Sequence, residues 1–147
     1  MGDLKVAVVG LGLGRLHVEA YAATETVDHL VVCDPDESRI AQLRQEFPQI
    51  AEGYTDLERL LQAESPDVVS IVTPDHLHRA HTTQCFDAGC HVLQTKPLAT
   101  NLDDARAIIQ AADASGKKFM VAHERRFRSH VRAIKEILEG GDLGDVV

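Results

Sequence analysis

The chain has 147 residues, of which 44% are apolar and 26% charged, as expected for one globular domain. Its formal net charge of −8 argues against a surface for nucleic acid or anionic membranes, because both reward net positive charge. No run of about 20 apolar residues occurs, which argues against a membrane-spanning helix.

A strand is predicted over residues 4–9, and three closely spaced glycines, Gly10, Gly12 and Gly14, follow it. A helix is predicted over residues 13–23 because apolar residues recur there at helical spacing. Its expected inner face consists of Leu16, Ala20 and Ala23. A strand that ends in a glycine turn and feeds a helix presents free backbone N–H groups and the positive end of the helix dipole. The sequence therefore predicts a phosphate or pyrophosphate site at this turn.

The rest of the chain alternates between short apolar runs and helical patterns. Further strands are predicted over residues 30–33, 50–52, 68–73, 90–93 and 119–122. The helices that follow them are predicted to begin near Pro35, Asp56, Leu77, Asn101 and Phe127. The apolar stripe of the fourth of these is Leu102, Ala105, Ile109 and Ala112, and that of the last is Phe127, Val131, Ile134 and Leu138.

Strands this apolar need helices on both faces, which indicates an α/β fold with a doubly wound parallel sheet and strand order 3-2-1-4-5-6. Residues 1–140 are then predicted to be one dinucleotide-binding Rossmann domain. Its ligand is expected in the crevice between strands one and four, where the strand order reverses.

Asp34 ends the second strand, 20 residues after Gly14. An acidic residue about that far from the glycines accepts hydrogen bonds from the adenine-ribose hydroxyls. Its charge would repel a 2′-phosphate, so the sequence favours NAD(H), with NADP(H) as the less favoured alternative. Arg39 complicates this preference, because it could stack on the adenine or tolerate a phosphate. The competing interpretation is a plain β–α turn in which Asp34 caps the next helix.

The glycine turn departs from the dinucleotide fingerprint G-x-G-x-x-G, because the third glycine comes one residue early and Arg15 occupies its place. Two interpretations stay open. Either the loop is one residue shorter, or Arg15 lies near the pyrophosphate. The predicted cofactor contacts in this segment are Gly10, Leu11, Gly12, Leu13, Gly14, Arg15 and Leu16.

The end of the fourth strand is rich in polar residues and faces the crevice where a nicotinamide would lie. Histidines at positions 76, 78 and 81 invite a metal interpretation. No other ligand cluster at metal spacing accompanies them, so we predict no metal and a histidine that faces the cofactor. The predicted cofactor contacts here are Thr73, Pro74, His76 and His78.

Lys96 follows the fifth strand, which directs it into the same crevice as the glycine turn. There its ammonium can hydrogen-bond a substrate hydroxyl and take part in proton transfer, so it is the predicted catalytic residue. The alternative is a solvated loop lysine. Thr95, Lys96, Pro97 and Glu124 are further predicted cofactor contacts, whereas the basic residues after Glu124 fit a solvated helix face.

Several short segments, in this order and spacing, run through the whole chain: Val8–His17, Cys33–Pro35 with Arg39, Thr73–His78, Gly89–Leu93, Lys96–Ala99, Arg126–Phe127 and Gly141–Gly144. Together they resemble the glucose–fructose oxidoreductase, inositol dehydrogenase and rhizopine-catabolism (Gfo/Idh/MocA) family of nicotinamide-dependent sugar and cyclitol dehydrogenases. The resemblance implies that Lys96 lies near nicotinamide and substrate. It also implies cofactor contacts by Gly10, Gly12, Asp34, Thr73, Pro74 and His78. The family usually reads Glu-Lys-Pro where this chain has Thr95-Lys96-Pro97, and it often has Asn in place of Glu124.

The resemblance further implies an oxidoreductase that passes hydride between NAD and a secondary alcohol of a sugar, cyclitol or similar polyol. Family members continue into a second α/β domain, which carries most of the substrate pocket, the proton-transfer residues and the oligomer contacts. Residues 141–147 are thus predicted to start a linker, and the chain to be the catalytically incomplete cofactor half of a homo-oligomeric enzyme. The alternative is a stand-alone dinucleotide-binding module that senses redox state without catalysis.

Cys33, Cys85 and Cys90 are odd in number and form no C-x-x-C pair, which indicates reduced, mostly buried thiols. The chain enters its first strand by residue 4, which leaves no room for a signal peptide. We therefore expect a cytoplasmic protein that binds small molecules, with neither nucleic acid nor membrane as a partner.

Overall fold

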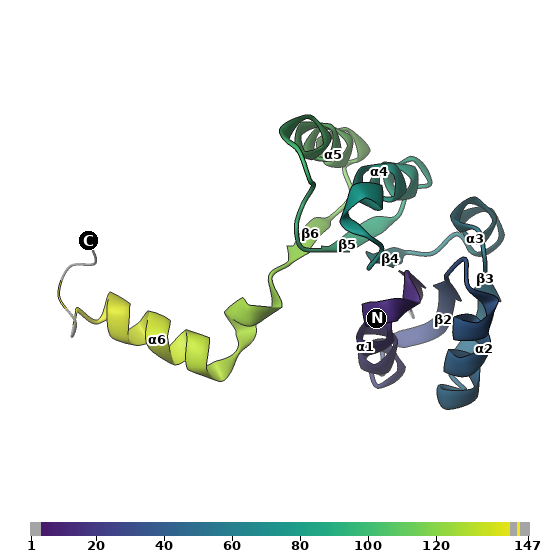
Figure 1. Ribbon diagram of the computed structural model, residues 1–147, viewed down its shortest axis with the longest axis horizontal. Helices are drawn as coiled ribbons and strands as arrows, with labels where there is room; N and C mark the ends of the chain where they lie inside the picture. Colours follow the sequence, from purple (N-terminus) through teal and green to yellow (C-terminus); the bar gives the residue numbers. More distant parts are fainter. Residues whose placement is uncertain (1–3, 142–143, 145–147) are drawn as a thin grey trace.

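Six parallel strands form one sheet in the computed structural model, which describes residues 4–141 and 144 (Figure 1). The strands are β1 (Leu4–Val9), β2 (Val27–Cys33), β3 (Ile50–Tyr54), β4 (Val68–Ile71), β5 (His91–Thr95) and β6 (Phe119–Ala122). They lie in the order β3-β2-β1-β4-β5-β6, and every neighbouring pair is parallel. The predicted doubly wound sheet and its strand order are confirmed.

Helices cover both faces of the sheet (Figure 1). They are α1 (Leu11–Ala22), α2 (Glu37–Glu46), α3 (Leu57–Glu64), α4 (His78–Asp87), α5 (Leu102–Ser115) and α6 (Ser129–Glu139), with short 3₁₀ turns η1 (Asp75–Leu77) and η2 (Glu124–Phe127). Val6 and Val8 of β1 pack with α1 and α2, whereas Ala7 and Val9 pack with α3 and α4. Alternate residues of one strand thus serve two apolar cores, as a sheet covered on both faces requires.

Side-chain caps set the start of three helices, α2, α3 and α5. Asp36 Oδ1 accepts a hydrogen bond from the Ser38 N–H (2.9 Å), so α2 begins after Asp36 and not at the predicted Pro35. Asn101 Oδ1 accepts from the Asp104 N–H (2.9 Å), which confirms the predicted start of α5.

The predicted inner face of α1 is wrong. The buried residues of the helix are Leu11, Gly14 and Val18, and the exposed ones include Leu16, Ala20 and Ala23. Hydropathy predicted that the larger apolar side chains face the sheet, but the small residue Gly14 faces it instead. The helix lies so close to β1 that a Cβ at position 14 would be 3.2 Å from Val8 Cγ1. Glycine therefore fits at this position.

The predicted stripe of α5 is partly wrong. Ala112 packs on the core as expected, but Ile108 is buried in place of Ile109, and Leu102 is exposed. All three cysteines are free and buried, in agreement with the predicted thiols, and burial raises the pKa of Cys33 to about 12.

The half of the sheet formed by β5 and β6 is open on the side of α1. Met120 of β6 is 47% exposed there. The predicted last helix, α6, is present but projects away from the sheet (Figure 1), and its exposed apolar residues include Ile134, Ile137 and Leu138. Of the predicted linker 141–147 only Gly141 and Gly144 are described, and the other five positions lie outside the described residues. Within the described part of the chain, every helix is too short or too polar to cross a membrane.

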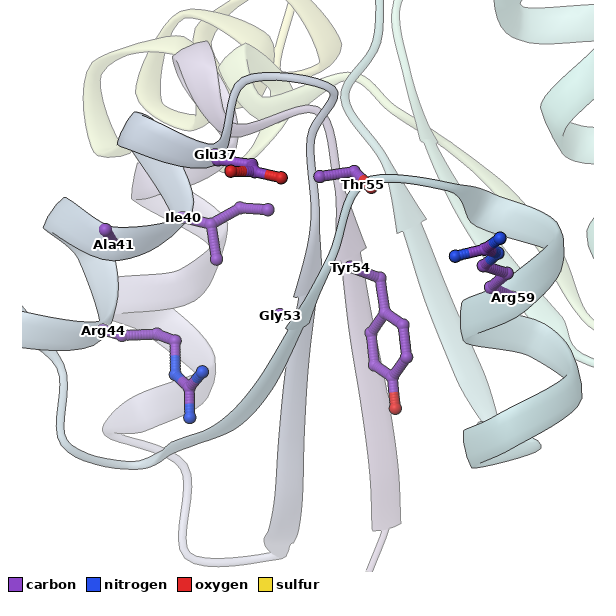
Figure 2. A pocket seen from close by; sticks show the side chains of 8 residues that line it. All are labelled: Glu37, Ile40, Ala41, Arg44, Gly53, Tyr54, Thr55 and Arg59. Atoms are coloured by element: carbon purple, nitrogen blue, oxygen red, sulfur yellow. The ribbon is translucent and has the colours of Figure 1, made fainter.

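Gly53 lets α2 pack against the edge strand β3. Figure 2 shows Ile40 of α2 beside Gly53, in a hollow of about 360 Å³ between α2, β3 and the start of α3. A Cβ on Gly53 would overlap Ile40 Cγ2. Isoleucine is held to one χ1 rotamer in a helix, so it cannot easily turn away. Gly53→Ala should therefore lower the free energy of unfolding, measured in urea, by about 1–3 kcal/mol.

Gly12→Ala is the matched control, because the nearest heavy atom to a Cβ at Gly12 is Arg39 Nη1 at 4.0 Å. That variant should not be destabilised, since alanine is the better helix former. Equal losses of stability in the two variants would contradict the packing role of Gly53.

Glu64 at the end of α3 joins two strands. It accepts a hydrogen bond from the Tyr54 hydroxyl of β3, and its Oε2 lies 2.8 Å from His29 Nε2 of β2. The hydrogen bond from Tyr54 is the largest cause of a pKa of Glu64 below its usual value, and the same bond raises the pKa of Tyr54 to about 12. The folded state thus favours the ionised carboxylate. Its contribution to stability is present above the unfolded pKa and is lost as pH falls through the lower folded pKa.

Glu64→Gln should accordingly destabilise the protein at pH 7 by about 1 kcal/mol. The difference from wild type should shrink to nothing as the pH falls below the lowered pKa of Glu64. Urea unfolding at a series of pH values measures both effects, with the exposed Glu58→Gln on the same helix as control. A difference that stays constant with pH would show that the carboxylate charge is irrelevant.

Candidate functional site

The turn between β1 and α1 runs directly against β4. Gly10 has a φ of 88°, and a Cβ there would lie 2.7 Å from the Val72 carbonyl oxygen. Glycine is the residue that accepts both this φ and this close approach. The Gly10 N–H donates to the Cys33 carbonyl at the end of β2 (2.8 Å). The turn is therefore held between the ends of β2 and β4, at the point where the strand order reverses.

Gly14 takes the packing role of the third fingerprint glycine. A Cβ on it would lie 3.2 Å from Val8 Cγ1 and 3.6 Å from Val72 Cβ. The helix thus reaches its close contact with the sheet one residue early. This geometry agrees with the shorter-loop interpretation of the departure from G-x-G-x-x-G.

Gly12, in contrast, faces open space on the outer side of the turn. The nearest heavy atom to a Cβ there would be Arg39 Nη1 at 4.0 Å. Because α1 begins at Leu11, the N–H groups of Gly12 and Leu13 lie in the first helical turn, where the helix itself offers no acceptor. The turn can therefore hold an anion such as a pyrophosphate against Gly12.

The guanidinium of Arg15 points toward α2, which does not support its predicted place beside the pyrophosphate. It pairs with Glu46 at the end of α2 and with Glu19 (3.3 Å), and it lies 5.6 Å from the centre of the Phe47 ring. These contacts direct the side chain toward α2 and away from the glycine turn. Arg15 is a solvent-exposed link between two helices.

Asp34 lies under the glycine turn and is only 4% exposed. Its Oδ2 accepts a hydrogen bond from the Leu11 N–H (2.7 Å), and its Oδ1 accepts from the Asp36 N–H (3.0 Å). The carboxylate thus holds the turn and the start of α2 in place. A cofactor contact by Leu11 is not supported, because its side chain is buried and its N–H is bound by Asp34. Each carboxylate oxygen can accept a further hydrogen bond, so Asp34 keeps capacity for a sugar hydroxyl.

Arg39 stands over this carboxylate. Its Nη1 lies 3.6 Å from Asp34 Oδ2, and its Nε lies 3.4 Å from Asp36 Oδ2. The side chain is more than half exposed and borders the open space at Gly12. Arg39 therefore partly offsets the negative charge of Asp34 where an adenosine would lie.

His78 is fully buried, which does not support its predicted contact with the cofactor. Its Nδ1 lies 2.8 Å from the Pro97 carbonyl oxygen, and its Nε2 lies 3.0 Å from the Thr73 carbonyl oxygen. The Gln94 amide donates to the same Pro97 carbonyl (3.2 Å). His78 thus joins the end of β4 to the segment that carries Lys96, and it positions both.

A cavity of about 690 Å³ opens beside the carboxyl ends of β4, β5 and β6, over the open half of the sheet. This volume falls in the range of about 300–1,000 Å³ that is usual for ligand pockets. The predicted site residues that line it are Leu13, Leu16, Thr73, Thr95, Lys96 and Glu124. The structure therefore brings four of the eight contacts predicted on the nicotinamide side into one cavity next to the glycine turn, namely Thr73, Thr95, Lys96 and Glu124.

Lys96 is exposed at the rim of this cavity, on the loop that follows β5. Asp75 and Arg128 complete the charged part of the lining. Thr95, where the family usually has glutamate, donates from Oγ1 to the Ile71 carbonyl (3.2 Å) and so ties β5 to β4. Lys96 is thus the amine that a hydroxyl group in the cavity could meet as a hydrogen-bond donor.

Three polar residues escaped the sequence-based prediction, two that line the cavity and a buried one that both of them contact. His17 and Tyr21 of α1 line the cavity, and both meet the fully buried Ser70 of β4. Ser70 Oγ lies 3.3 Å from His17 Nδ1 and 2.9 Å from the Tyr21 hydroxyl. Burial lowers the pKa of His17, which favours the neutral imidazole. The available signal was the four-residue spacing of His17 and Tyr21, which places them on one helix face.

Two of the histidines after β4 contact Thr73, His78 at its carbonyl oxygen and His81 at its hydroxyl. His81 Nδ1 lies 3.1 Å from Thr73 Oγ1, and burial, followed by the charges of His78 and His76, lowers the pKa of His81. Across residues 4–141 and 144, histidine, cysteine, aspartate and glutamate nowhere gather as three or more potential metal ligands.

The model of the oxidoreductase family with an NAD-binding Rossmann fold matches residues 4–123. The match includes the glycine turn, Asp34, the end of β4 and Lys96. The chain belongs to the Gfo/Idh/MocA oxidoreductase family. The resemblance that the short motifs carried is thereby confirmed, and so is the assignment of the fold as an NAD-binding Rossmann domain.

Two relatives are named for a glucoside and an inositol. The D-glucoside 3-dehydrogenase of Escherichia coli (strain K12) is 30% identical over 145 residues, which are 97% of this chain and 41% of that protein. The scyllo-inositol 2-dehydrogenase (NADP(+)) of Bacillus subtilis (strain 168) is 29% identical over 143 residues, which are 97% of this chain and 39% of that protein.

Among solved structures, the scyllo-inositol dehydrogenase of Lactobacillus casei with bound NAD(H) and scyllo-inositol superposes with a TM-score of 0.89 at 25% identity. The superposition covers 97% of this chain and 43% of that one. The chain therefore spans about two fifths of the length of these family members.

Proposed function

We propose that this chain is the cofactor half of an enzyme that passes hydride between NAD(H) and a secondary alcohol of a sugar, cyclitol or similar polyol. The observation that carries the proposal is the buried carboxylate of Asp34 beneath an open glycine turn, with Lys96 at the rim of a cavity on the same edge of the sheet. One edge thus offers a dinucleotide site and a hydroxyl-binding amine.

The residues present fit a nicotinamide dinucleotide. The pyrophosphate would meet the N–H groups of Gly12 and Leu13, in the space that a Cβ on Gly12 would fill. The adenosine would lie on the side of Asp34 and Arg39, and the nicotinamide on the side of the cavity. Thr73, Pro74, His76, Thr95, Pro97 and Glu124 would border the nicotinamide half.

NAD(H) is proposed over NADP(H) because a 2′-phosphate would approach the Asp34 carboxylate. Arg39 offsets part of that repulsion, but it is already engaged by Asp34 and Asp36. The family includes a member whose name specifies NADP(+), so the preference depends on these side chains and not on the fold.

When bound, the nicotinamide supplies the hydride acceptor or donor. Lys96 would donate a hydrogen bond to the oxygen of the reacting alcohol, which orients that oxygen and stabilises negative charge as its proton leaves. Thr95 holds the loop of Lys96 at the end of β5 through its bond to Ile71.

We further propose that residues 1–140 are one dinucleotide-binding domain and that residues 141–147 begin a linker to a second α/β domain. The lengths of the relatives support this division. The second domain would complete the substrate pocket, supply the proton acceptor and carry the contacts of a homo-oligomer. A cytoplasmic location is consistent with the three reduced thiols.

The test is a titration of the 147-residue chain with NADH and with NADPH, in which nucleotide fluorescence or calorimetry measures binding. NADH should bind saturably, and NADPH should bind at least about tenfold more weakly, a difference of about 1.4 kcal/mol. Gly12→Ala, which the fold should tolerate, should weaken NADH binding because the added methyl group occupies the pyrophosphate space. Failure of both nucleotides to bind wild type would overturn the proposal, and tighter binding of NADPH would overturn the choice of NAD.

A further inference from the structure

The polar chain formed by Tyr21, Ser70 and His17 has no part in the function proposed so far. It lies on the α1 wall of the 690 Å³ cavity, where most neighbours are apolar. His17 is six residues beyond Leu11, so it lies about 9 Å along the helix from the glycine turn. Both nucleosides of the ligand are joined to the pyrophosphate, and the adenosine is assigned to the side of Asp34 and Arg39, so the nicotinamide riboside is the half that extends toward His17.

The hydrogen-bond chain fixes the orientation of the His17 ring. Nδ1 faces Ser70 Oγ, whose other neighbour is the Tyr21 hydroxyl. If Tyr21 donates to Ser70, the Ser70 proton goes to His17 Nδ1, and the neutral imidazole carries its own proton on Nε2. If the chain runs the other way, Nε2 is an acceptor. Within the described residues, Nε2 makes no hydrogen bond to the protein.

A carboxamide suits either direction of this chain, because it offers both an N–H donor and a C=O acceptor. The rest of the wall is also suited to an aromatic ring, since Leu13, Val72 and Ala122 line the same cavity. The adenine end of the ligand is already assigned to the opposite side, at Asp34. The nicotinamide is therefore the ring that the cavity can receive.

We propose that His17 binds the nicotinamide carboxamide through Nε2, and that Ser70 and Tyr21 position the imidazole ring of His17. The inference rests on the proposed function and deepens it, because it assigns the α1 wall of the cavity to the nicotinamide end of the dinucleotide. His17 would thereby help to choose which edge of the ring faces the substrate.

The experiment compares NADH with ADP-ribose, which carries the adenosine and pyrophosphate but no nicotinamide. In the 147-residue chain, His17→Ala should weaken NADH binding by about 3- to 10-fold, the value of one net hydrogen bond, and leave ADP-ribose binding unchanged. His17→Gln, which keeps a donor and an acceptor, should restore part of the loss. Ser70→Ala should show a smaller loss, again for NADH alone.

His130→Ala on the exposed helix α6 is the matched control and should bind both ligands as wild type does. Equal weakening of NADH and ADP-ribose by His17→Ala, or no weakening of NADH, would overturn the role of His17. Wild type that binds neither ligand would instead overturn the proposed function itself. Circular dichroism on each variant shows that the compared proteins are folded.

Discussion

His78→Ala should lower the free energy of unfolding by about 3 kcal/mol or more. The imidazole is fully buried, so its removal leaves a cavity that the surrounding helix and loop can close only in part. It also removes the imidazole from the Thr73 and Pro97 carbonyls, and of the two only the Pro97 carbonyl keeps a side-chain donor among the residues that the structure describes, the Gln94 amide. Urea unfolding followed by circular dichroism measures the loss.

His76→Ala is the natural control, because His76 is exposed on the preceding 3₁₀ turn and should change stability little. The free energy of unfolding of His78→Gln should lie between those of His78→Ala and His76→Ala, since an amide can keep one of the two carbonyl contacts. If His78→Ala were as stable as His76→Ala, the view that His78 joins the ends of β4 and β5 would be wrong.

His78→Ala also shows whether His78 acts by positioning the loop of Lys96 or by direct contact with the ligand. Without His78, the loop of Lys96 loses its link to the end of β4, so the cavity side of the site should loosen. The glycine turn and Asp34 share no contact with His78, so binding of ADP-ribose should persist in the folded variant. A complete loss of ADP-ribose binding would contradict this separation.

The arrangement of the sheet was predictable because apolar runs and helical patterns alternate along the chain. A parallel sheet buried on both faces is the packing that such strands permit. The inner faces of the helices were less predictable. At α1, hydropathy ranked Leu16 above Gly14, but the distance between helix and sheet decides the contact. That distance depends on the close approach of Gly10 to Val72, which directly follows β4.

The positions of the site residues were predicted better than their orientations. Strand ends can be read from the sequence, and the carboxyl ends of parallel strands lie at one edge of the sheet. The prediction that Thr73, Lys96 and Glu124 lie close together therefore holds, because all three line one cavity. Orientation depends on turns that the pattern does not reveal. The 3₁₀ turn at Asp75–Leu77 rotates His78 into the core, where the prediction had placed it against the cofactor.

Asp34→Ala should weaken NADH binding by about 10- to 100-fold, the value of hydrogen bonds to a charged group. Two effects act together. The ribose hydroxyls lose their acceptor, and the Leu11 and Asp36 N–H groups lose theirs, so the glycine turn is less well held for the pyrophosphate. Calorimetric titration of the folded variant with NADH, NADPH and ADP-ribose measures the two effects together, and urea unfolding measures how much stability the turn loses.

NADPH separates these two effects. Loosening of the turn should weaken both dinucleotides alike, whereas loss of the carboxylate removes repulsion from the 2′-phosphate alone and releases Arg39 from Asp34. The affinity ratio of NADH to NADPH should therefore fall, even though NADH binding is weaker. Asp36→Ala is the control, because it removes the other carboxylate that pairs with Arg39 but leaves the buried carboxylate in place. If both variants changed the ratio equally, the preference would depend on Arg39, and Asp34 would serve only to hold the turn.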